Sequence, residues 1–408
     1  MAARMSPKTS SRSGAVYPTV GFTVLACLLS MFPPVTGDIY LPALPQLTAD
    51  LGGTTAQGQH TLAGYFLGLG LGQLLYGPVA DRLGRRPVML FGSILYVVAT
   101  IGCFLVSNIE QMIVMRFMQA VAACSGVVIS AAIVRDRFDR QESARIYSML
   151  LMARSLGPMF APILGGILVA FFGWRGVFGA LAVFGVTILL AVIFGLPETR
   201  TDAVAAQARS ESALGAYAAA LGNGTILGYI VTNGFNFAIM FAWISVAPFL
   251  LINEYGVPAL WFGWIFGTLG MALLISAQLN RRLLRAHDGD AVMLWGAGLT
   301  AVAACALLLT VTQGIGGLLG VLVPLFFAIF SLGLVSTNAM AGALAVDPTR
   351  SGSVSALVGT GQFCFAAIVA WLASTISPDP ALALAIVVFC CAVGTLVYPI
   401  MRLLRRAR

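Results

Sequence analysis

Residues 77–90 read GPVADRLGRRPVML, a short charged segment that separates two long apolar runs. Three arginines and one aspartate are concentrated in it, whereas the runs on either side carry almost no charge. Gly77 and Gly84 permit a tight turn and a close approach of the backbone. The segment therefore predicts a turn between two membrane-spanning helices, with Asp81 placed to accept hydrogen bonds from an arginine or a helix N-terminus.

The composition extends this pattern to the whole chain. Of 408 residues, 59% are hydrophobic and 9% are charged, and the mean hydropathy is +0.94. Soluble domains carry about 25% charged residues, so a soluble fold is excluded. A spanning helix takes about 20 residues, which predicts an all-α integral membrane protein with twelve transmembrane helices, near 17–42, 57–80, 87–106, 109–134, 143–171, 175–196, 224–252, 258–280, 291–312, 315–345, 350–376 and 381–403.

The basic residues predict the orientation of these helices. One alternating set of connections, with both tails, holds 20 of the 23 Lys and Arg, and the other set holds only Arg175. Because positive residues stay on the cytoplasmic side, both termini are expected in the cytoplasm of a bacterial cell, with the chain in its inner membrane. The first apolar run is too long for a signal peptide and lacks a small-residue cleavage site, so we expect it to remain as a helix.

The longest polar connection suggests a division of the chain into halves. It predicts an N-terminal six-helix bundle over 1–196, a cytoplasmic linker over 197–222 and a C-terminal six-helix bundle over 223–408. The connections near 80–90 and 280–294 are both basic and both follow the second helix of a half. This similarity between the two connections is typical of two pseudo-symmetric repeats.

Several kinds of function are disfavoured. The seven cysteines fall inside apolar runs and form no CxxC or Cys/His cluster, so neither a metal site nor a disulfide is expected. The chain has no phosphate-binding Walker loop and no serine–histidine–acid set, which argues against ATP-driven transport and against an enzyme. The net charge of +8 is spread over short connections, so membrane topology explains it better than nucleic-acid binding.

The order of residues in 77–90 resembles motif A of the major facilitator superfamily, whose members fold as twelve helices in two bundles. The resemblance assigns a conformational switch to the residues that match this motif, Gly77, Asp81, Arg82, Gly84, Arg85 and Arg86. In that family the motif's aspartate holds the outward-facing state through contacts with helices 4 and 11. Here this implies Asp81 near Arg135 and near the segment TRSGS at 349–353.

Three further stretches carry the resemblance. RFMQAVAACSG, from Arg116, is similar to motif B, although Ala120 stands where a glycine is usual. GPMFAPILGG is similar to motif C of antiporters, through Gly157, Pro158, Pro162, Gly165 and Gly166. DIYLPALP, from Asp38, is similar to the first-helix signature of the Bcr/CflA drug:proton antiporters. Motif C is also explained simply as a kink that aids helix packing.

Asp38 is the one carboxylate of 15 acids that we place inside a span. A charge there is costly unless it faces a cavity, finds a partner or takes up a proton. Arg116 is expected at the same depth as Asp38, since each residue lies about six positions, or about 9 Å, from the outer end of its helix. Burial disfavours a charged carboxylate, and a nearby cation favours it. A change in the distance between Asp38 and Arg116 would therefore make Asp38 take up or release a proton. The alternative is a static pair that only joins two helices.

The substrate cavity is predicted with less support. Pro33 and Pro34 are expected to kink the first helix just below Asp38. Arg154 lies nearer the middle of its span, where the family has an uncharged residue, and it either faces the cavity or has a structural role. The other candidates are aromatic and amide residues that suit amphipathic compounds: Tyr40, Tyr65, Gln119, Asn236, Phe237, Phe241 and Gln362.

Together these features predict a secondary active exporter. The resemblance implies a monomer that expels amphipathic antibacterial compounds, such as bicyclomycin, sulfonamides or amphenicols, in exchange for protons. No cofactor is expected, because the proton gradient supplies the energy; the partners are the lipid bilayer, protons and the substrate, and no nucleic acid. The same fold would serve a proton-coupled transporter of a metabolite such as an amino acid. A membrane sensor or scaffold is a third, weaker interpretation.

Overall fold

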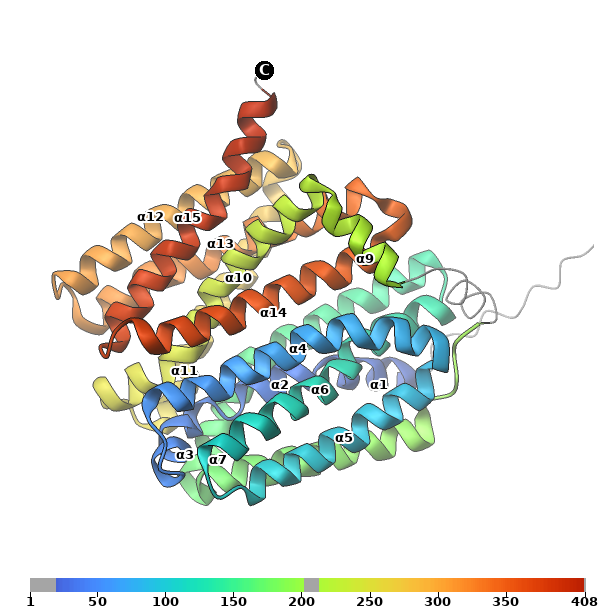
Figure 1. Cartoon of the computed structure of the whole chain (residues 1–408), viewed down its shortest axis with the longest axis horizontal. Coiled ribbons are helices and arrows are strands. Elements are labelled where there is room, and N and C mark those ends of the chain that lie inside the picture. Colours follow the sequence, from blue (N-terminus) through green and yellow to red (C-terminus); the bar gives the residue numbers. More distant parts are fainter. Residues whose placement is uncertain (1–19, 202–212, 407–408) are drawn as a thin grey trace, which may run out of the picture.

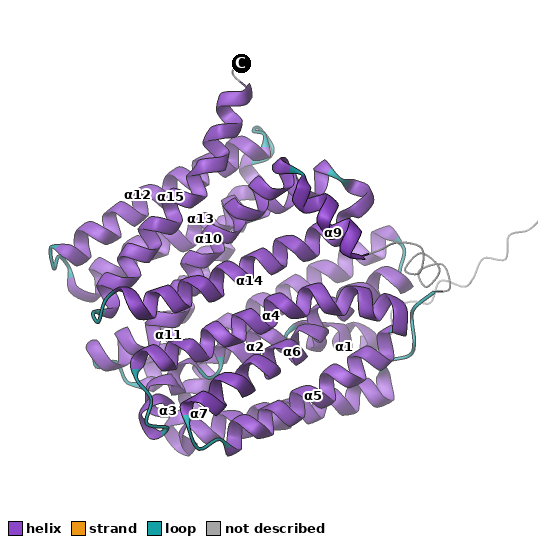
Figure 2. Ribbon diagram, viewed as in Figure 1, coloured by secondary structure: helices purple, strands orange, loops and turns teal. Residues whose placement is uncertain are grey.

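The computed structural model describes residues 20–201 and 213–406, and these residues form helices and short turns with no strand among them (Figure 2). Ten of the helices are long and apolar enough to cross a membrane, and a bent pair at the start adds an eleventh. The helix α7 (Arg140–Gly195) contains two spans, because Gly173 interrupts its 56 residues with a φ of 66°. The described ranges therefore hold the twelve predicted spans, whereas the predicted basic tail before residue 20 lies outside them.

Figure 1 shows the helices in chain order. The first half contains, besides α7, α1 (Val20–Ser30), α2 (Phe32–Asp38), η1 (Leu41–Ala43), α3 (Leu44–Asp50), α4 (Thr55–Leu83), α5 (Arg85–Leu105) and α6 (Ile109–Arg137). The second half contains α9 (Ala213–Gly222), α10 (Gly224–Pro248), η2 (Phe249–Glu254), α11 (Ala259–Leu283), α12 (Gly289–Thr312), α13 (Gly317–Val346), η3 (Pro348–Arg350), α14 (Ser351–Ile376) and α15 (Pro380–Arg406).

The helices pack mainly within each half. In the first half α6 packs against α4 and α5, and α5 packs against α7; in the second half α12 packs against α13 and α15, and α10 packs against the same two helices. Two long contacts cross between the halves, α4 with α14 and α7 with α11. The connection between α7 and α10 contains α9 and residues 202–212, which lie outside the described part. The division at 197–222 stays a prediction.

The first span is broken, as the two prolines predict. A bend of 43° separates Gly21–Ser30 from Phe32–Asp50. Pro33 lies in the first turn of α2, where a missing N–H costs nothing. The helix is interrupted again after Asp38, because Ile39 and Tyr40 form a turn before η1. The predicted single helix over 17–42 is therefore a chain of short helices that ends at Asp50.

Large apolar side chains cover the outside of the molecule. Leu105, Phe171 and Phe194 are each at least 70% exposed. Such a surface is stable only against lipid. One end of the molecule, here called the basic end, carries the charged turn at 81–86 and the last turns of α15, and the opposite end carries α3 and the start of α11 (Figure 1).

Candidate proton and substrate site

Asp38 is the last residue of α2, at the break in the first span. It is 8% exposed and has no ion pair within 4.0 Å among the described residues. Motif C packs against the same segment. A Cβ on Gly157 would lie 3.0 Å from Pro34, and one on Gly165 would collide with the carbonyl oxygen of Ile39. Glycines in α7 therefore allow the broken helix to approach closely and present its carboxylate to the interior.

Arg116 lies at the level of Asp38, as the depth argument predicts, but the two do not form a direct pair. The guanidinium is fully buried, and its Nη1 donates to the carbonyl oxygen of Thr36 at 3.2 Å and to Oε1 of Gln119. It also lies between two rings, with its Cζ 3.9 Å from the Tyr40 centroid and 4.2 Å from the Tyr65 centroid. Cation–π contact with both tyrosines holds the guanidinium in this position.

The two tyrosines and Gln119 are themselves fixed by hydrogen bonds. Tyr65 donates to the carbonyl oxygen of Pro33 at 2.7 Å, and the Tyr40 hydroxyl lies 3.2 Å from Oγ1 of Thr61. Gln119 donates to Oγ1 of Thr100 at 2.7 Å. The predicted residues Tyr40, Tyr65, Arg116 and Gln119 therefore belong to one network around the broken helix. Nε and Nη2 of Arg116 are buried without a partner among the described residues.

Three residues of this network were not predicted. They are Thr36, Tyr96 and Thr100, and the hydroxyls of Thr36 and Tyr96 lie 2.8 Å apart. Tyr96 and Thr100 are spaced i, i+4 on α5, and this polar stripe on an apolar helix is the signal that the sequence offered.

The candidates of the second half form a separate, uncharged group. The Nδ2 atom of Asn236 lies 3.4 Å from Oγ1 of Thr300 and 3.5 Å from Oγ of Ser331. Asn233, one turn earlier on α10, was not predicted, and both polar atoms of its amide are buried without a partner among the described residues. Gln362 is half-buried on α14. The two asparagines thus supply amide groups without charge.

Aromatic rings connect the two halves. Phe241 of α10 lies 4.4 Å from the ring of Phe66 on α4 and 5.7 Å from that of Phe363 on α14. Phe237 lies on the same side of α10, 6.1 Å from Phe241. The predicted phenylalanines therefore sit where the two halves meet, together with Phe66 and Phe363, which were not predicted.

Arg154 lies at a different depth from Asp38 and Arg116. Its Nη2 is 3.4 Å from the carbonyl oxygen of Val127, and its Nε is buried without a partner in the described ranges. Val127 follows Arg116 by eleven residues on α6, so the two arginines are separated by about 16 Å along that helix. The structure does not bring Arg154 into the network around Asp38.

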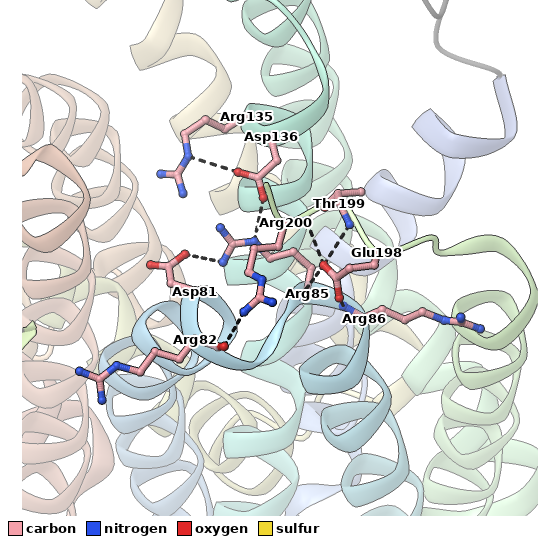
Figure 3. Close-up of polar contacts among 9 residues, drawn as sticks. All are labelled: Asp81, Arg82, Arg85, Arg86, Arg135, Asp136, Glu198, Thr199 and Arg200. Atoms are coloured by element: carbon pink, nitrogen blue, oxygen red, sulfur yellow. Dashed lines mark hydrogen bonds and ion pairs between the residues drawn. The ribbon is translucent and has the colours of Figure 1, made fainter. Parts of the chain in front are cut away.

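The turn at 77–86 is organised around Arg85 (Figure 3). Arg85 is 1% exposed; it pairs with Asp81 at 2.5 Å and, through Nε, with Asp136 at 2.8 Å. Arg135 is directed to Asp136, at 4.0 Å, and not to Asp81 as the resemblance implies. Arg85 can reach Asp81 because the two are four residues apart and Gly84 turns the chain between them with a φ of 109°.

One other expectation at this turn is not met. A Cβ on Gly77 would meet no atom within 4 Å, so Gly77 makes no close approach. The expected proximity of Asp81 to the segment 349–353 stays a prediction. At the opposite end of the molecule, a Cβ on Gly166 would collide with the carbonyl oxygen of Ala259 on α11, so α7 and α11 pack closely there.

Glu198, just after α7, was not predicted to have a role. Its carboxylate accepts hydrogen bonds from the backbone N–H groups of Arg85 at 2.9 Å and Arg86 at 3.2 Å, at the start of α5. It also accepts from the N–H groups of Thr199 and Arg200. Partial burial opposes the charged form, but these four N–H donors prevail and hold the pKa of Glu198 below its ordinary value. The Arg200 side chain donates to the carbonyl oxygen of Arg82, and this hydrogen bond also stabilises the turn.

Known proteins are similar to this chain along most of its length. The model of the Major Facilitator Superfamily matches residues 26–370. The bicyclomycin resistance protein homolog of Haemophilus influenzae is 28% identical over 360 residues, which are 88% of this chain and 90% of that protein. The chloramphenicol resistance protein of Pseudomonas aeruginosa is 31% identical over 343 residues, 81% of this chain and 77% of that protein.

A solved structure agrees on the fold. The crystal structure of a D-xylose-proton symporter superposes with a TM-score of 0.73 at 13% identity, covering 93% of this chain and 97% of the other. The family match, the relatives and the twelve spans lead to one conclusion: this chain belongs to the major facilitator superfamily and is a multi-pass membrane transporter, not an enzyme.

Proposed function

We propose that the chain is a secondary active exporter, which moves amphipathic drugs out of the cytoplasm in exchange for protons by alternating access. Asp38 takes up and releases the proton, and Arg116 modulates it. The transporter acts as a monomer in the bacterial inner membrane, with both termini in the cytoplasm and without a cofactor. The names of the relatives that match most of the chain support resistance to bicyclomycin or chloramphenicol as the biological outcome.

One observation carries this proposal: Asp38 and Arg116 share a layer without forming a pair. A static ion pair between helices would keep both charges in contact. Here Tyr40 and Tyr65 hold the arginine, and the carboxylate is left to bind a proton. A rearrangement that moves Arg116 off the rings would favour the charged carboxylate and expel the proton.

The substrate would bind between this network and the second half. Aromatic rings at the interface of the halves suit apolar ring systems. Asn233 and Asn236 add neutral hydrogen-bonding groups on α10. Because α7 and α11 pack closely at Gly166 and Ala259, we expect the end opposite the basic end to be closed to substrate in this conformation.

Transport in proteoliposomes tests the proposal. The protein is reconstituted with a pH-sensitive dye, and proton movement is recorded on addition of chloramphenicol or bicyclomycin. Wild type should move protons only when drug is present, Asp38→Asn should not, and Asp38→Glu should retain part of the activity. Equal drug flux with and without a pH gradient would contradict proton exchange. Proton-coupled flux of an amino acid but of no drug would favour the metabolite transporter.

A further inference from the structure

A pocket of about 270 Å³ lies at the basic end, far along the chain from the proposed transport site. It opens between the start of α10 and the last turns of α15. Its walls combine two cations, two hydroxyl groups and one thioether, from Thr225, Tyr398, Met401, Arg402 and Arg405. None of these residues contributes to the network around Asp38.

Arg402 is held in place by its neighbours. Its Nε pairs with Asp290, and its Nη1 donates to the hydroxyl of Tyr398 at 3.1 Å. The Tyr229 hydroxyl donates to the other oxygen of Asp290 at 2.7 Å, and the Tyr229 ring lies 5.0 Å from the guanidinium. These contacts engage Nε and Nη1 of Arg402. Its Nη2 has no hydrogen-bond partner among the described residues.

Arg405 supplies the second cation. It follows Arg402 by three residues on α15, so both side chains leave the helix on the same side. Arg405 is exposed and takes part in no ion pair within the described ranges. The first turn of α10, where Thr225 lies, presents the positive end of a helix dipole to the same space. The pocket therefore has an excess of donors and positive charge.

The surface beside the pocket is apolar. On the last turns of α15 the side chains at and near the arginines are exposed, with values of 52% for Val397, 42% for Ile400, 44% for Met401 and 59% for Leu404. Apolar side chains exposed on a spanning helix contact acyl chains. Figure 1 shows α15 running beyond its neighbours toward the C-terminus. The arginines thus lie at the depth where lipid headgroups begin.

We propose that this pocket binds the phosphate group of an anionic phospholipid, with Arg405 and Nη2 of Arg402 as its donors. Guanidinium groups bind phosphate through paired hydrogen bonds, and basic pockets between helices on the cytoplasmic side suit anionic headgroups. The adjoining apolar face favours a lipid over a soluble phosphate, because it accommodates the acyl chains. The site links α10 to α15 and is independent of the proton exchange proposed above.

Lipid retention measures this binding. Wild type, Arg405→Gln and Arg285→Gln are purified in detergent, exchanged into mixed micelles with phosphatidylglycerol or phosphatidylethanolamine, and studied by native mass spectrometry. Arg285 is the matched control, since it is exposed in the basic connection before α12 and lies outside the pocket. We expect wild type and Arg285→Gln to retain phosphatidylglycerol, and Arg405→Gln to retain about fivefold less.

Further conditions of the same experiment distinguish a lipid phosphate from a soluble phosphate. Phosphatidylethanolamine, which is zwitterionic, should bind weakly to all three proteins. Excess inorganic phosphate should not displace phosphatidylglycerol from wild type; complete displacement would assign the pocket to a soluble phosphate and overturn the lipid proposal. Equal retention of phosphatidylglycerol by all three proteins would also overturn it. Arg405→Lys, which keeps the charge but loses the paired donors, should retain an intermediate amount.

Discussion

Arg85 and Arg116 are both almost fully buried, at 1% and 0% exposure, yet their surroundings differ. Arg85 lies between two carboxylates, Asp81 and Asp136, at the basic end. Arg116 has no carboxylate within ion-pairing distance among the described residues, and its neighbours are a carbonyl oxygen, an amide and two tyrosine rings. The first arginine has two carboxylate partners, and the second has none among the described residues.

This difference separates two uses of a buried cation. A paired arginine resists movement, because separating it from its partners leaves uncompensated charges in an apolar environment. An unpaired one interacts with any acid that gains or loses a proton nearby. Under the proposed function, the turn at 81–86 would be the fixed part of the first half, and the residues around Asp38 would be the part that responds to protonation.

Replacement of Arg116 should have the largest effect, on transport. Arg116→Gln removes the charge that modulates Asp38, so drug accumulation should lose its dependence on the proton gradient. A potential of 100 mV is worth about 2.3 kcal/mol per charge, or about fiftyfold in a concentration ratio. Drug uptake into inverted vesicles measures the loss. Unchanged accumulation would show that the arginine only joins two helices.

Replacement of Arg85 should have the largest effect on stability. Arg85→Gln leaves Asp81 and the buried Asp136 without their cation, and breaking a buried pair costs about 3–5 kcal/mol. Denaturant unfolding in detergent compares this variant with Arg116→Gln, for which we expect a smaller loss. If Arg116→Gln were the less stable of the two, the contrast between the arginines would be reversed.

Gly84 tests whether the turn at 81–86 depends on its backbone. Gly84→Ala places a Cβ at a φ of 109°, 2.5 Å from Oε2 of Glu198. The strained backbone should lower stability by about 1–3 kcal/mol. Gly77→Ala is the control, since its Cβ would meet open space within a helix, and it should be neutral or slightly stabilising. Equal loss in both variants would attribute the effect to the added methyl group alone.

Glu198 should have the smallest effect, one that depends on pH. Its pKa is lowered in the folded protein, so its stabilisation is present above the unfolded pKa of about 4.3 and is lost as the pH falls through the folded value. Glu198→Gln should be less stable than wild type at pH 7, by about 1 kcal/mol or less because the group is exposed to solvent. Thermal unfolding across this pH range should show the two proteins converging on acidification. A constant difference would exclude the charge as the cause.

The sequence predicted those features that depend on periodicity and depth. Apolar runs of span length predicted the all-helical membrane fold, and counting residues from a helix end placed Arg116 at the level of Asp38. The two prolines predicted the bend in the first span. Each of these follows from the regular rise of a helix, which a single sequence displays.

Partners of side chains were harder to predict. Arg82, Arg85 and Arg86 are near neighbours in one turn, and only the conformation of Gly84 decides that Arg85 points inward to Asp81. Glu198 was not predicted because its long-range partners are two backbone N–H groups more than 110 residues away, and these have no signature in the sequence. Arg116 was expected to face an acid, but it contacts two aromatic rings, one from the turn after α2 and one from α4.

The break at Gly173 has a consequence for how the protein is made. The two spans within α7 are separated by that single non-helical residue, and Trp174, which follows it, donates a hydrogen bond to Asp50. With no loop between them, the two spans form a tight helical hairpin. In the predicted orientation, this hairpin would insert into the bilayer as one unit and carry Arg175 across the membrane at its tip.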